Sequence, residues 1–384
     1  MIKNHTIGVR LGLAAAAMAA LLWVGSPEPA LAAVGPVILA PTPSPSDCGS
    51  YHTAETDPVA ALDAAKTGKV LVCPGTYNLS GEITITGANN LTIARAVTTG
   101  ATFPTFDMAT GVTTGMDIAQ SSNVIIDGLI FDGSANTQGG YINLEYEQSS
   151  GAVRNSSLIQ PNTAQTVGLY AFEDASNKPL SMVITNTSVM GAGFAGVLAS
   201  GPLKLTMTGV VVNAPDGGRI TTPGRGLALG AASTTLIPSG RVDRCVFLAG
   251  SVPAVQLADV TGFTLSHSLL SSQTNSDLTV SAGEHNAAGI KIVGNTFTLG
   301  MSNPAIRVTD SSATFKISGM SITGNLITAG QHGTAQPALA VTSSATQASS
   351  VMVSLSGNTL AGFLTAVTVT GLADVTAGHN TILP

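Results

Sequence analysis

The stretch Ile292-Val293-Gly294-Asn295-Thr296-Phe297 recurs in looser form about ten times along the chain. Clear later copies are Ile322-Thr323-Gly324-Asn325-Leu326-Ile327 and Leu355-Ser356-Gly357-Asn358-Thr359-Leu360. Each copy keeps an apolar residue, a turn and a second apolar residue in that order. Successive copies lie roughly 21 to 37 residues apart, which fits one supersecondary unit per period and is too short for an independent domain. The repeat therefore predicts a solenoid.

The composition favours short strands over helices. Aromatic residues make up 4% and charged residues 9% of the 384 residues, and the chain holds 43 glycines. Abundant Gly, Ser, Thr, Ala and Val, with almost no long helical pattern, indicate many short strands joined by turns. The net charge of −6 argues against a nucleic-acid partner, because such a partner needs a basic surface.

The N-terminal region divides into a leader and a linker. Residues 1–32 have Lys3 and Arg10 ahead of an apolar run and end at the small-residue site Ala30-Leu31-Ala32, which predicts an export signal. Residues 33–50 contain a Pro/Ser/Thr-rich extended linker, and residues 51–384 form the solenoid. No other stretch reaches the roughly 18 apolar residues of a membrane span. We therefore expect no transmembrane segment, and a secreted or periplasmic protein.

The two ends of the solenoid differ in sequence. Asp57-Pro58, the helix formers up to Lys66 and then Gly68 predict a short helix. Its place before the first strand suits a cap over the open end of the core. The C-terminal end has no such helix or charged segment, so it could be covered by a second subunit, in a homo-oligomer, or simply fray.

The segment Val70-Leu71-Val72-Cys73-Pro74-Gly75-Thr76-Tyr77 and the strands after it resemble the opening coil of right-handed parallel β-helix proteins of the pectate-lyase-like superfamily. The resemblance covers essentially the whole chain beyond the linker. It implies an all-β, right-handed parallel β-helix with a short N-terminal capping helix. It does not fix the activity, because the superfamily contains lyases, hydrolases, epimerases, phage tailspikes and adhesins.

The chain contains three cysteines. Cys48 and Cys73 bracket the first ordered segment, so in an oxidising compartment we expect a disulfide between them. Cys245 takes the repeat position that Asn295 and Asn325 hold elsewhere, and we interpret it as a small buried thiol in the turn stack.

Alternation along each coil predicts a column of outward side chains on one parallel sheet. Its members are Asp117, Glu145, Tyr170, then, after one poorly aligned coil near Val197, Ala228, Gln256, Thr279, Arg307, Ala340 and Thr368.

The early part of this column concentrates the few charges of the chain. Asp117, Glu145 and Glu147 are the predicted catalytic residues. The predicted substrate-binding residues are Asn143, Tyr170, Phe172 and Glu173, with Arg219 and Arg225 from a long Gly/Pro-rich insertion. Aromatic faces stack on sugar rings and carboxylates bind hydroxyl groups, so the patch predicts a saccharide groove.

Three roles for the acidic patch remain open. Stacked Asp117 and Glu145 could act as the paired acids of a glycoside hydrolase. The carboxylates could instead hold Ca²⁺ and bridge an acidic polysaccharide, as the resemblance to pectate-lyase-like enzymes allows. The patch could also be a solvated face that opposes strand association.

The functional alternatives are therefore a polysaccharide lyase or hydrolase and a non-catalytic surface, matrix or adhesion protein. For a lyase, none of the basic residues Arg154, Lys204, Arg219 and Arg225 is a compelling base. Motifs that mark alginate-type epimerases and polygalacturonase-like hydrolases are absent from the sequence.

Overall fold

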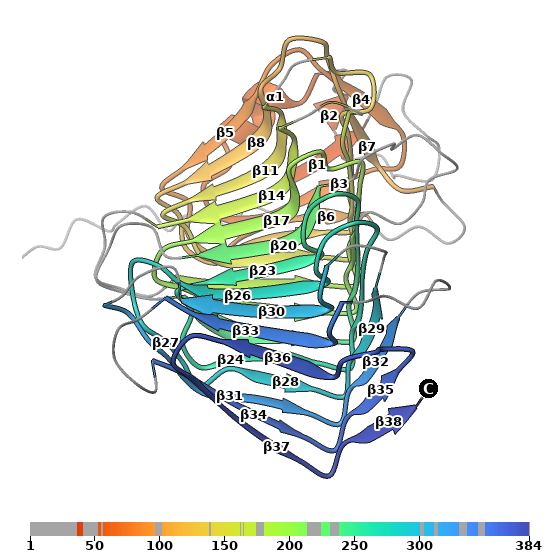
Figure 1. Ribbon diagram of the computed structural model, residues 1–384. Coiled ribbons are helices and arrows are strands. Elements are labelled where there is room, and N and C mark those ends of the chain that lie inside the picture. The colour runs from red at the N-terminus through yellow and green to blue at the C-terminus, as the bar shows by residue number, and fades with distance from the viewer. Residues whose placement is uncertain are drawn as a thin grey trace, which may run out of the picture. The chain divides into compact units, whose positions relative to one another are not determined.

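The computed structural model describes residues 37–40, 53–54, 57–96, 102–137, 140–161, 163, 165–173, 180–212, 224–230, 238–299, 303–310, 314–329, 336–344 and 350–383. Within these residues the chain runs repeatedly through three sheets, here called A, B and C, and every strand pair is parallel (Figure 1). Each coil contributes strands in the order A, B, C, so residues one coil apart in sequence become neighbours on a sheet. This is the predicted parallel β-helix.

Sheet A contains β1 (Val37–Ala40), β2 (Thr53–Ala54), β3 (Gly68–Val72), β6 (Leu91–Arg95), β9 (Val124–Asp127), β12 (Gly151–Arg154), β15 (Leu180–Thr185), β18 (Leu203–Thr208), β21 (Ser239–Asp243), β24 (Phe263–Ser266), β27 (Ala287–Ala288), β28 (Lys291–Val293), β31 (Ile317–Thr323), β34 (Val351–Ser356) and β37 (Ala373–Gly378). Sheet B contains β4 (Thr76–Leu79), β7 (Thr105–Met108), β10 (Ile130–Asp132), β13 (Ser157–Ile159), β16 (Ser188–Met190), β19 (Val211–Val212), β22 (Val246–Ala249), β25 (Leu269–Ser272), β29 (Thr296–Leu299), β32 (Leu326–Ala329), β35 (Thr359–Ala361) and β38 (Thr381–Leu383). Sheet C contains β5 (Ile83–Thr86), β8 (Thr114–Ala119), β11 (Ile142–Glu147), β14 (Val167–Phe172), β17 (Ala195–Ser200), β20 (Arg225–Gly230), β23 (Val255–Ala258), β26 (Leu278–Ala282), β30 (Ile306–Asp310), β33 (Leu339–Ser343) and β36 (Val367–Thr370).

The interior is a continuous apolar core shared by all coils. Alternate residues of each strand point inward, and the inward side chains of successive coils stack on one another. On sheet B, the Tyr77, Phe106 and Phe131 rings pack edge to face, with centroids 5.6 and 5.3 Å apart. Such pairs add about 0.5–1.5 kcal/mol beyond their buried area.

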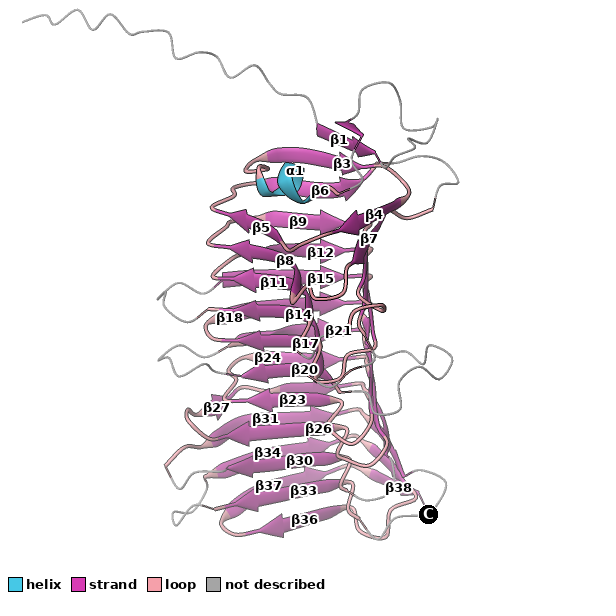
Figure 2. Cartoon of the chain, turned by 90° about the horizontal axis from the view of Figure 1, so that it is seen from above, coloured by secondary structure: helices cyan, strands magenta, loops and turns pink. Residues whose placement is uncertain are grey.

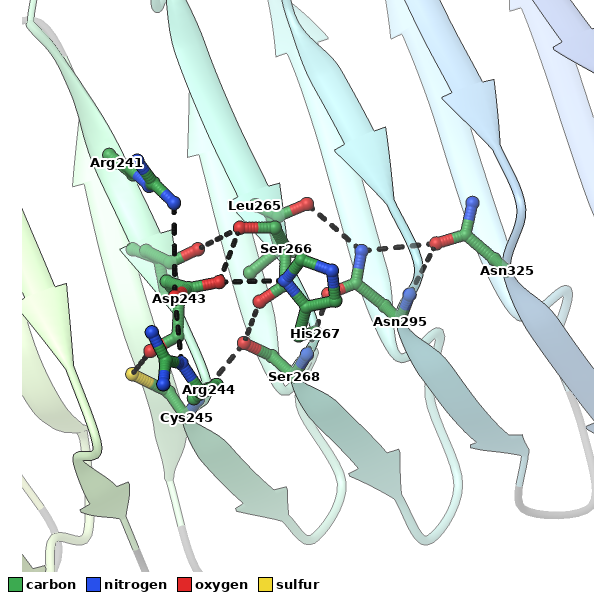
Figure 3. A network of polar contacts seen from close by, with 11 residues as sticks. Arg241, Asp243, Arg244, Cys245, Leu265, Ser266, His267, Ser268, Asn295 and Asn325 are labelled. Atoms are coloured by element: carbon green, nitrogen blue, oxygen red, sulfur yellow. Dashed lines mark hydrogen bonds and ion pairs between the residues drawn. The ribbon is translucent and has the colours of Figure 1, made fainter.

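The turn between sheets A and B explains the repeated Gly-Asn. Its first residue takes a left-handed conformation, with φ near +64° at Gly294 and +48° at His267, so glycine and asparagine are favoured there. In later coils the second residue is an inward asparagine, and these amides form a ladder. Asn295 Nδ2 donates to Asn325 Oδ1 at 3.0 Å (Figure 3). Asn325 Nδ2 donates in turn to Asn358 Oδ1 at 2.9 Å.

Helix α1 (Val59–Asp63) lies where the sequence predicts a helix, but it is shorter than predicted. It packs against β5, and its Leu62 side chain is fully buried in the core. The helix lies near the N-terminal end of the stack of coils (Figure 2). The role of this segment as a cap over the end of the core remains a prediction.

Several predictions concern segments that the structure does not describe. The leader, most of the linker and Cys48 lie outside the described residues, so the pairing of Cys48 with the buried Cys73 remains a prediction. Cys245 is an unpaired, buried thiol in the turn stack, as predicted. The described part of the chain has no helix that is long and apolar enough to cross a membrane. A homo-oligomer through the C-terminal end also remains a prediction.

Candidate active site

The outward column predicted on one sheet is the central column of sheet C. Glu145 pairs with Asp117 on one side and with Tyr170 on the other, and Thr84 precedes Asp117. The poorly aligned coil contributes Leu198. Beyond it the register continues through Ala228, Gln256, Thr279, Arg307, Ala340 and Thr368. The placement of Asp117, Glu145 and Tyr170 as stacked neighbours is therefore confirmed.

A second outward column runs beside the first, two residues further along each strand. In it Glu147 pairs with Ala119 and with Phe172. Strand β11 thus carries two outward carboxylates, and β14 carries an aromatic ring next to each of them. The Tyr170 and Phe172 rings stack on one another, with centroids 4.8 Å apart and planes 22° apart. Together these side chains form a half-buried surface with acids on one strand and a flat aromatic platform on the next.

Crowding of carboxyl groups changes the acidity of this surface. Burial raises the pKa of Glu145 to about 7, and the nearby Asp117, Glu147 and Glu82 carboxyls add to the rise. Burial, and then the charge of Glu147, raise the pKa of Asp117 to about 6. The Oδ1 atom of Asp117 is buried without a hydrogen-bond partner among the described residues, which fits a carboxyl that ionises reluctantly.

A fourth acid, Glu82, belongs to the cluster and was missed in the sequence. It directly precedes β5, and its pKa is raised by burial, by Asp117 and by Asp63 of α1. Asp63 accepts a hydrogen bond from the Thr84 amide at 2.6 Å. The period-two alternation of β5 could have identified Glu82, because Glu82 and Thr84 alternate with inward Ile83 and Ile85.

The placement of Asn143 on the outer face is wrong. Its side chain is 0% exposed. Asn143 Nδ2 lies 3.2 Å from the Tyr141 hydroxyl, and Asn143 Oδ1 accepts a hydrogen bond from Gln160 Nε2. Asn143 and Leu144 both face the interior, since the chain turns a corner from sheet B at this point. Neighbouring coils place Gly115 and Gly168 at this corner, where a Cβ atom would overlap packed atoms.

The expectation that Glu173 joins the outward patch is also wrong. Glu173 is 1% exposed and lies just beyond the end of β14, at the turn that leads toward sheet A. Alternation continued from outward Tyr170 and Phe172 places Glu173 inward, in agreement with its burial. Asn143 and Glu173 are therefore removed from the candidate site.

The two predicted arginines have different outcomes. Arg219 lies outside the described residues, so its role remains a prediction. Arg225 begins β20, farther along sheet C than the acids. Its guanidinium lies over the Phe194 ring, 5.1 Å from the centroid, and Arg225 Nε donates to Gln256 Oε1 at 2.5 Å. Arg225, Gln256 and Leu198 help to line a small pocket of about 210 Å³. The pocket follows the aromatic platform along sheet C, because β17 and β20 come after β14 in the strand order.

A Ca²⁺ ion at the acidic surface is one of the expected alternatives. Among the described residues, no group of three or more His, Cys, Asp and Glu side chains is placed to hold a metal ion. Ca²⁺ binding remains a prediction, and the reaction below uses only side chains of this chain.

A second polar cluster lies on the turn between sheets A and B (Figure 3). Asp243 is 4% exposed, and its Oδ1 lies 2.8 Å from both His267 Nδ1 and Ser266 Oγ, while its Oδ2 accepts from Arg244 Nε at 3.0 Å. These hydrogen bonds, led by that from His267, hold the pKa of Asp243 well below its ordinary value. His267 takes the left-handed turn position that Gly294 takes in the next coil. The cluster therefore links two successive coils and stabilises the turn between sheets A and B.

Comparison with known proteins bears on the fold. No protein-family model matches the sequence, and no curated protein matches it. Among solved structures, the Azotobacter vinelandii mannuronan C-5 epimerase AlgE6 A-module is 16% identical, with a TM-score of 0.59, over 85% of this chain and 93% of that chain. A double mutant of the periplasmic alginate epimerase AlgG is 11% identical, with a TM-score of 0.48, over 82% of this chain and 77% of that chain. The catalytic unit of the GH87 α-1,3-glucanase from Streptomyces thermodiastaticus is 15% identical, with a TM-score of 0.40, over 85% of this chain and 65% of that chain.

At 16% identity, the likeness to the first of these structures bears on the architecture and on no individual site residue. It covers 85% of this chain and 93% of that chain. The chain therefore has the parallel β-helix fold that its opening coil predicts.

Proposed function

We propose that the protein is an exported glycoside hydrolase that cleaves a polysaccharide on the outer face of sheet C. The observation that carries the proposal is the register of Asp117, Glu145 and Tyr170 on β8, β11 and β14. It brings together an acid pair of unequal pKa and an aromatic platform, in a chain with few charges and few aromatic residues. Export through the leader, in a secreted or periplasmic protein, is part of the proposal.

The unequal acidities of the pair assign the roles. Burial raises the pKa of both carboxyls, and that of Glu145 further, so Glu145 is the member of the pair that holds its proton more readily. Glu145 then acts as the general acid that protonates the leaving glycosidic oxygen, while Asp117 attacks the sugar as the nucleophile; water then hydrolyses the glycosyl-enzyme, with Glu145 as the base. Parallel strands lie about 4.8 Å apart, which is close to the roughly 5 Å carboxyl separation of retaining glycosidases.

The surrounding side chains supply binding. Tyr170 and Phe172 present one flat aromatic surface beside the acids, suited to the apolar face of a sugar ring. Glu147 and Glu82 can accept hydrogen bonds from sugar hydroxyl groups. The pocket around Leu198 and Arg225 continues the surface toward later coils.

Electrostatics favour a hydrolase over a lyase. Four crowded carboxyl groups repel a uronate, and no salt bridge joins a described Lys or Arg to any of them. A lyase or epimerase needs the carboxylate of its substrate to be neutralised and a base beside it. A neutral polysaccharide meets no such barrier, so we propose a neutral glycan as substrate.

The test is a screen of the purified protein against neutral and uronic-acid polysaccharides. We expect chain shortening of a neutral glycan, with new reducing ends and no absorbance from unsaturated ends. The Asp117→Asn/Glu145→Gln double variant should yield no product. Absorbance from unsaturated ends would instead identify a lyase. No shortening of any glycan, with binding retained, would support the alternative of a non-catalytic adhesion or matrix protein.

A further inference from the structure

A pocket of about 480 Å³ lies away from sheet C, at the turn between sheets A and B and on the outer face of sheet B. This volume is in the range of small-ligand sites, roughly 300–1,000 Å³. Its lining comes from Phe103, Ile130, Asn155, Ser156, Ser157, Asn186, Thr187, Ser188, Gly209 and Val211. None of these residues belongs to the acidic surface.

One wall of this pocket is an exposed aromatic ring. Phe103 is 42% exposed and is the only aromatic residue among the large apolar side chains that are exposed in the described part of the chain. The Arg95 guanidinium lies over the ring, 4.4 Å from its centroid. This contact leaves the other face of the ring for a ligand. An isolated exposed aromatic ring that lines a hollow has the geometry of a stacking platform.

The floor of the pocket is built from short polar side chains in register on adjacent coils. Ser188 Oγ donates to Ser157 Oγ at 2.9 Å, and the two residues pair across β13 and β16. Asn155 and Asn186 stack in the left-handed turn position, where Asn186 Nδ2 donates to Asn155 Oδ1 at 3.4 Å. The second N–H of the Asn186 amide and the Ser157 hydroxyl hydrogen are donors that these two contacts do not use.

The charge of the lining restricts the ligand. None of the lining residues is ionisable, and Ile130 and Val211 add apolar contact at the two ends. Hydroxyl and amide groups on the floor, an aromatic wall and the absence of charge in the lining match a sugar ring, which has apolar C–H faces and a hydroxyl edge. A charged ligand would find no ion partner in the lining.

We propose that this pocket is a second carbohydrate-binding site, which takes one or two neutral pyranose residues of a glycan. Phe103 stacks on a ring face, while Ser157, Ser188 and Asn186 bind hydroxyl groups. The site lies on another face of the same coils as the acidic surface, so it binds glycan independently of that surface. It does not require the proposed hydrolase activity to be correct.

The test is isothermal titration of the purified protein with cellohexaose, mannohexaose and maltohexaose. We expect at least one of the three to bind, and Phe103→Leu to weaken that binding by about 10-fold, since one decade corresponds to loss of a single good contact. Phe103→Tyr should bind within about 2-fold of the wild type. Because Phe103 is exposed, neither substitution should disturb the core. Thermal melting like that of the wild type will confirm that both variants fold.

Two further variants test the floor and the independence of the site. Asn186→Gly removes the amide at a position whose counterpart in the next coil is Gly209, with the same left-handed backbone, and it should weaken binding. Arg307→Gln, on a later coil of sheet C, should leave the affinity unchanged. The proposal is overturned if none of the three hexasaccharides binds, if Phe103→Leu binds like the wild type, or if Phe103→Leu no longer weakens binding in a Tyr170→Ala background.

Discussion

Two columns of side chains run along this solenoid, and they show opposite consequences of the same register. In the turn between sheets A and B, Asn295, Asn325, Asn358 and Asn380 stack coil upon coil, and each of the first three amides donates to the amide oxygen of the next. On sheet C, Asp117 and Glu145 stack in the same way, but carboxylates only accept, and their charges repel. Stacking like side chains stabilises the fold when they are amides and costs free energy when they are acids.

The difference explains where function is placed. The asparagine ladder satisfies buried backbone groups, as when Asn325 Nδ2 donates to Ile292 O at 2.9 Å, so its residues are explained by structure alone. Nothing in the fold requires acids on β8 and β11, because the same outward column carries Ala228, Gln256 and Thr279 in later coils. Perturbed acids without a structural task are typical of functional sites.

Removal of the proposed general acid should have the largest effect on activity. Glu145→Gln should lower kcat/KM on the cleaved glycan by about 10²–10⁴-fold, because the general acid is lost while the side-chain shape is kept. Arg307→Gln, in the same outward column but far from the acids, is the matched control and should keep wild-type turnover. A Glu145→Gln variant with near wild-type rates would remove Glu145 from the mechanism.

The ladder should respond in stability instead of activity. Asn325→Ala removes the side-chain acceptor of the Asn295 backbone amide, the side-chain donor to the Ile292 carbonyl and one of the two hydrogen bonds that Asn358 Oδ1 accepts. We expect the free energy of unfolding to fall by about 3 kcal/mol, measured by urea denaturation. The control is Asn155→Gly, at an exposed, left-handed turn position, which should change stability only slightly. Equal effects of the two changes would contradict the structural role of the ladder.

The acid column should also give the protein a pH-dependent stability. Because the pKa values of Asp117 and Glu145 are raised to about 6 and about 7 in the folded state, their contribution is full at low pH and is lost as pH rises through those values. Both groups are half exposed, so solvent weakens the effect, and we expect Tm to be about 2–4 °C lower at pH 8 than at pH 5 from this source.

The Asp117→Asn/Glu145→Gln double variant isolates this effect. Burial also raises the pKa of Asp277, which adds a decrease of the same sign in both proteins. The wild type should therefore lose more Tm than the double variant between pH 5 and pH 8, by differential scanning calorimetry. Identical pH profiles would show that the acids do not repel one another in solution.

The smallest expected effect concerns the aromatic platform. Tyr170→Ala removes one of two stacked rings and should raise KM for the glycan by about 2–10-fold, with kcat nearly unchanged. Leu198→Ala, the next outward position of the column, is the control and should alter KM less. A large fall in kcat with unchanged KM would instead mean that Tyr170 acts in the chemical step.

Much of this organisation could be predicted from the sequence, because period-two alternation and the Gly-Asn turns act locally. The column through Asp117, Glu145 and Tyr170 follows from those patterns. Alternation failed at Asn143, where a corner places two successive residues inside, whereas at Glu173 the alternation continued from Phe172 already indicates an inward side chain. The glycines at the equivalent corner of neighbouring coils were the overlooked signal.

The sequence by itself determined the repeat, the parallel stack and the side of each strand that faces water, since these depend on residue type and spacing along one coil. Only the tertiary structure decided which acids perturb one another, that Glu82 and Asp63 join them, and that Phe103 stands over a polar pocket with Ser157 and Asn186. The physical reason is that acidity and pocket shape depend on burial and on distances between side chains of different coils. Spacing along the chain does not specify those distances until the coils are packed.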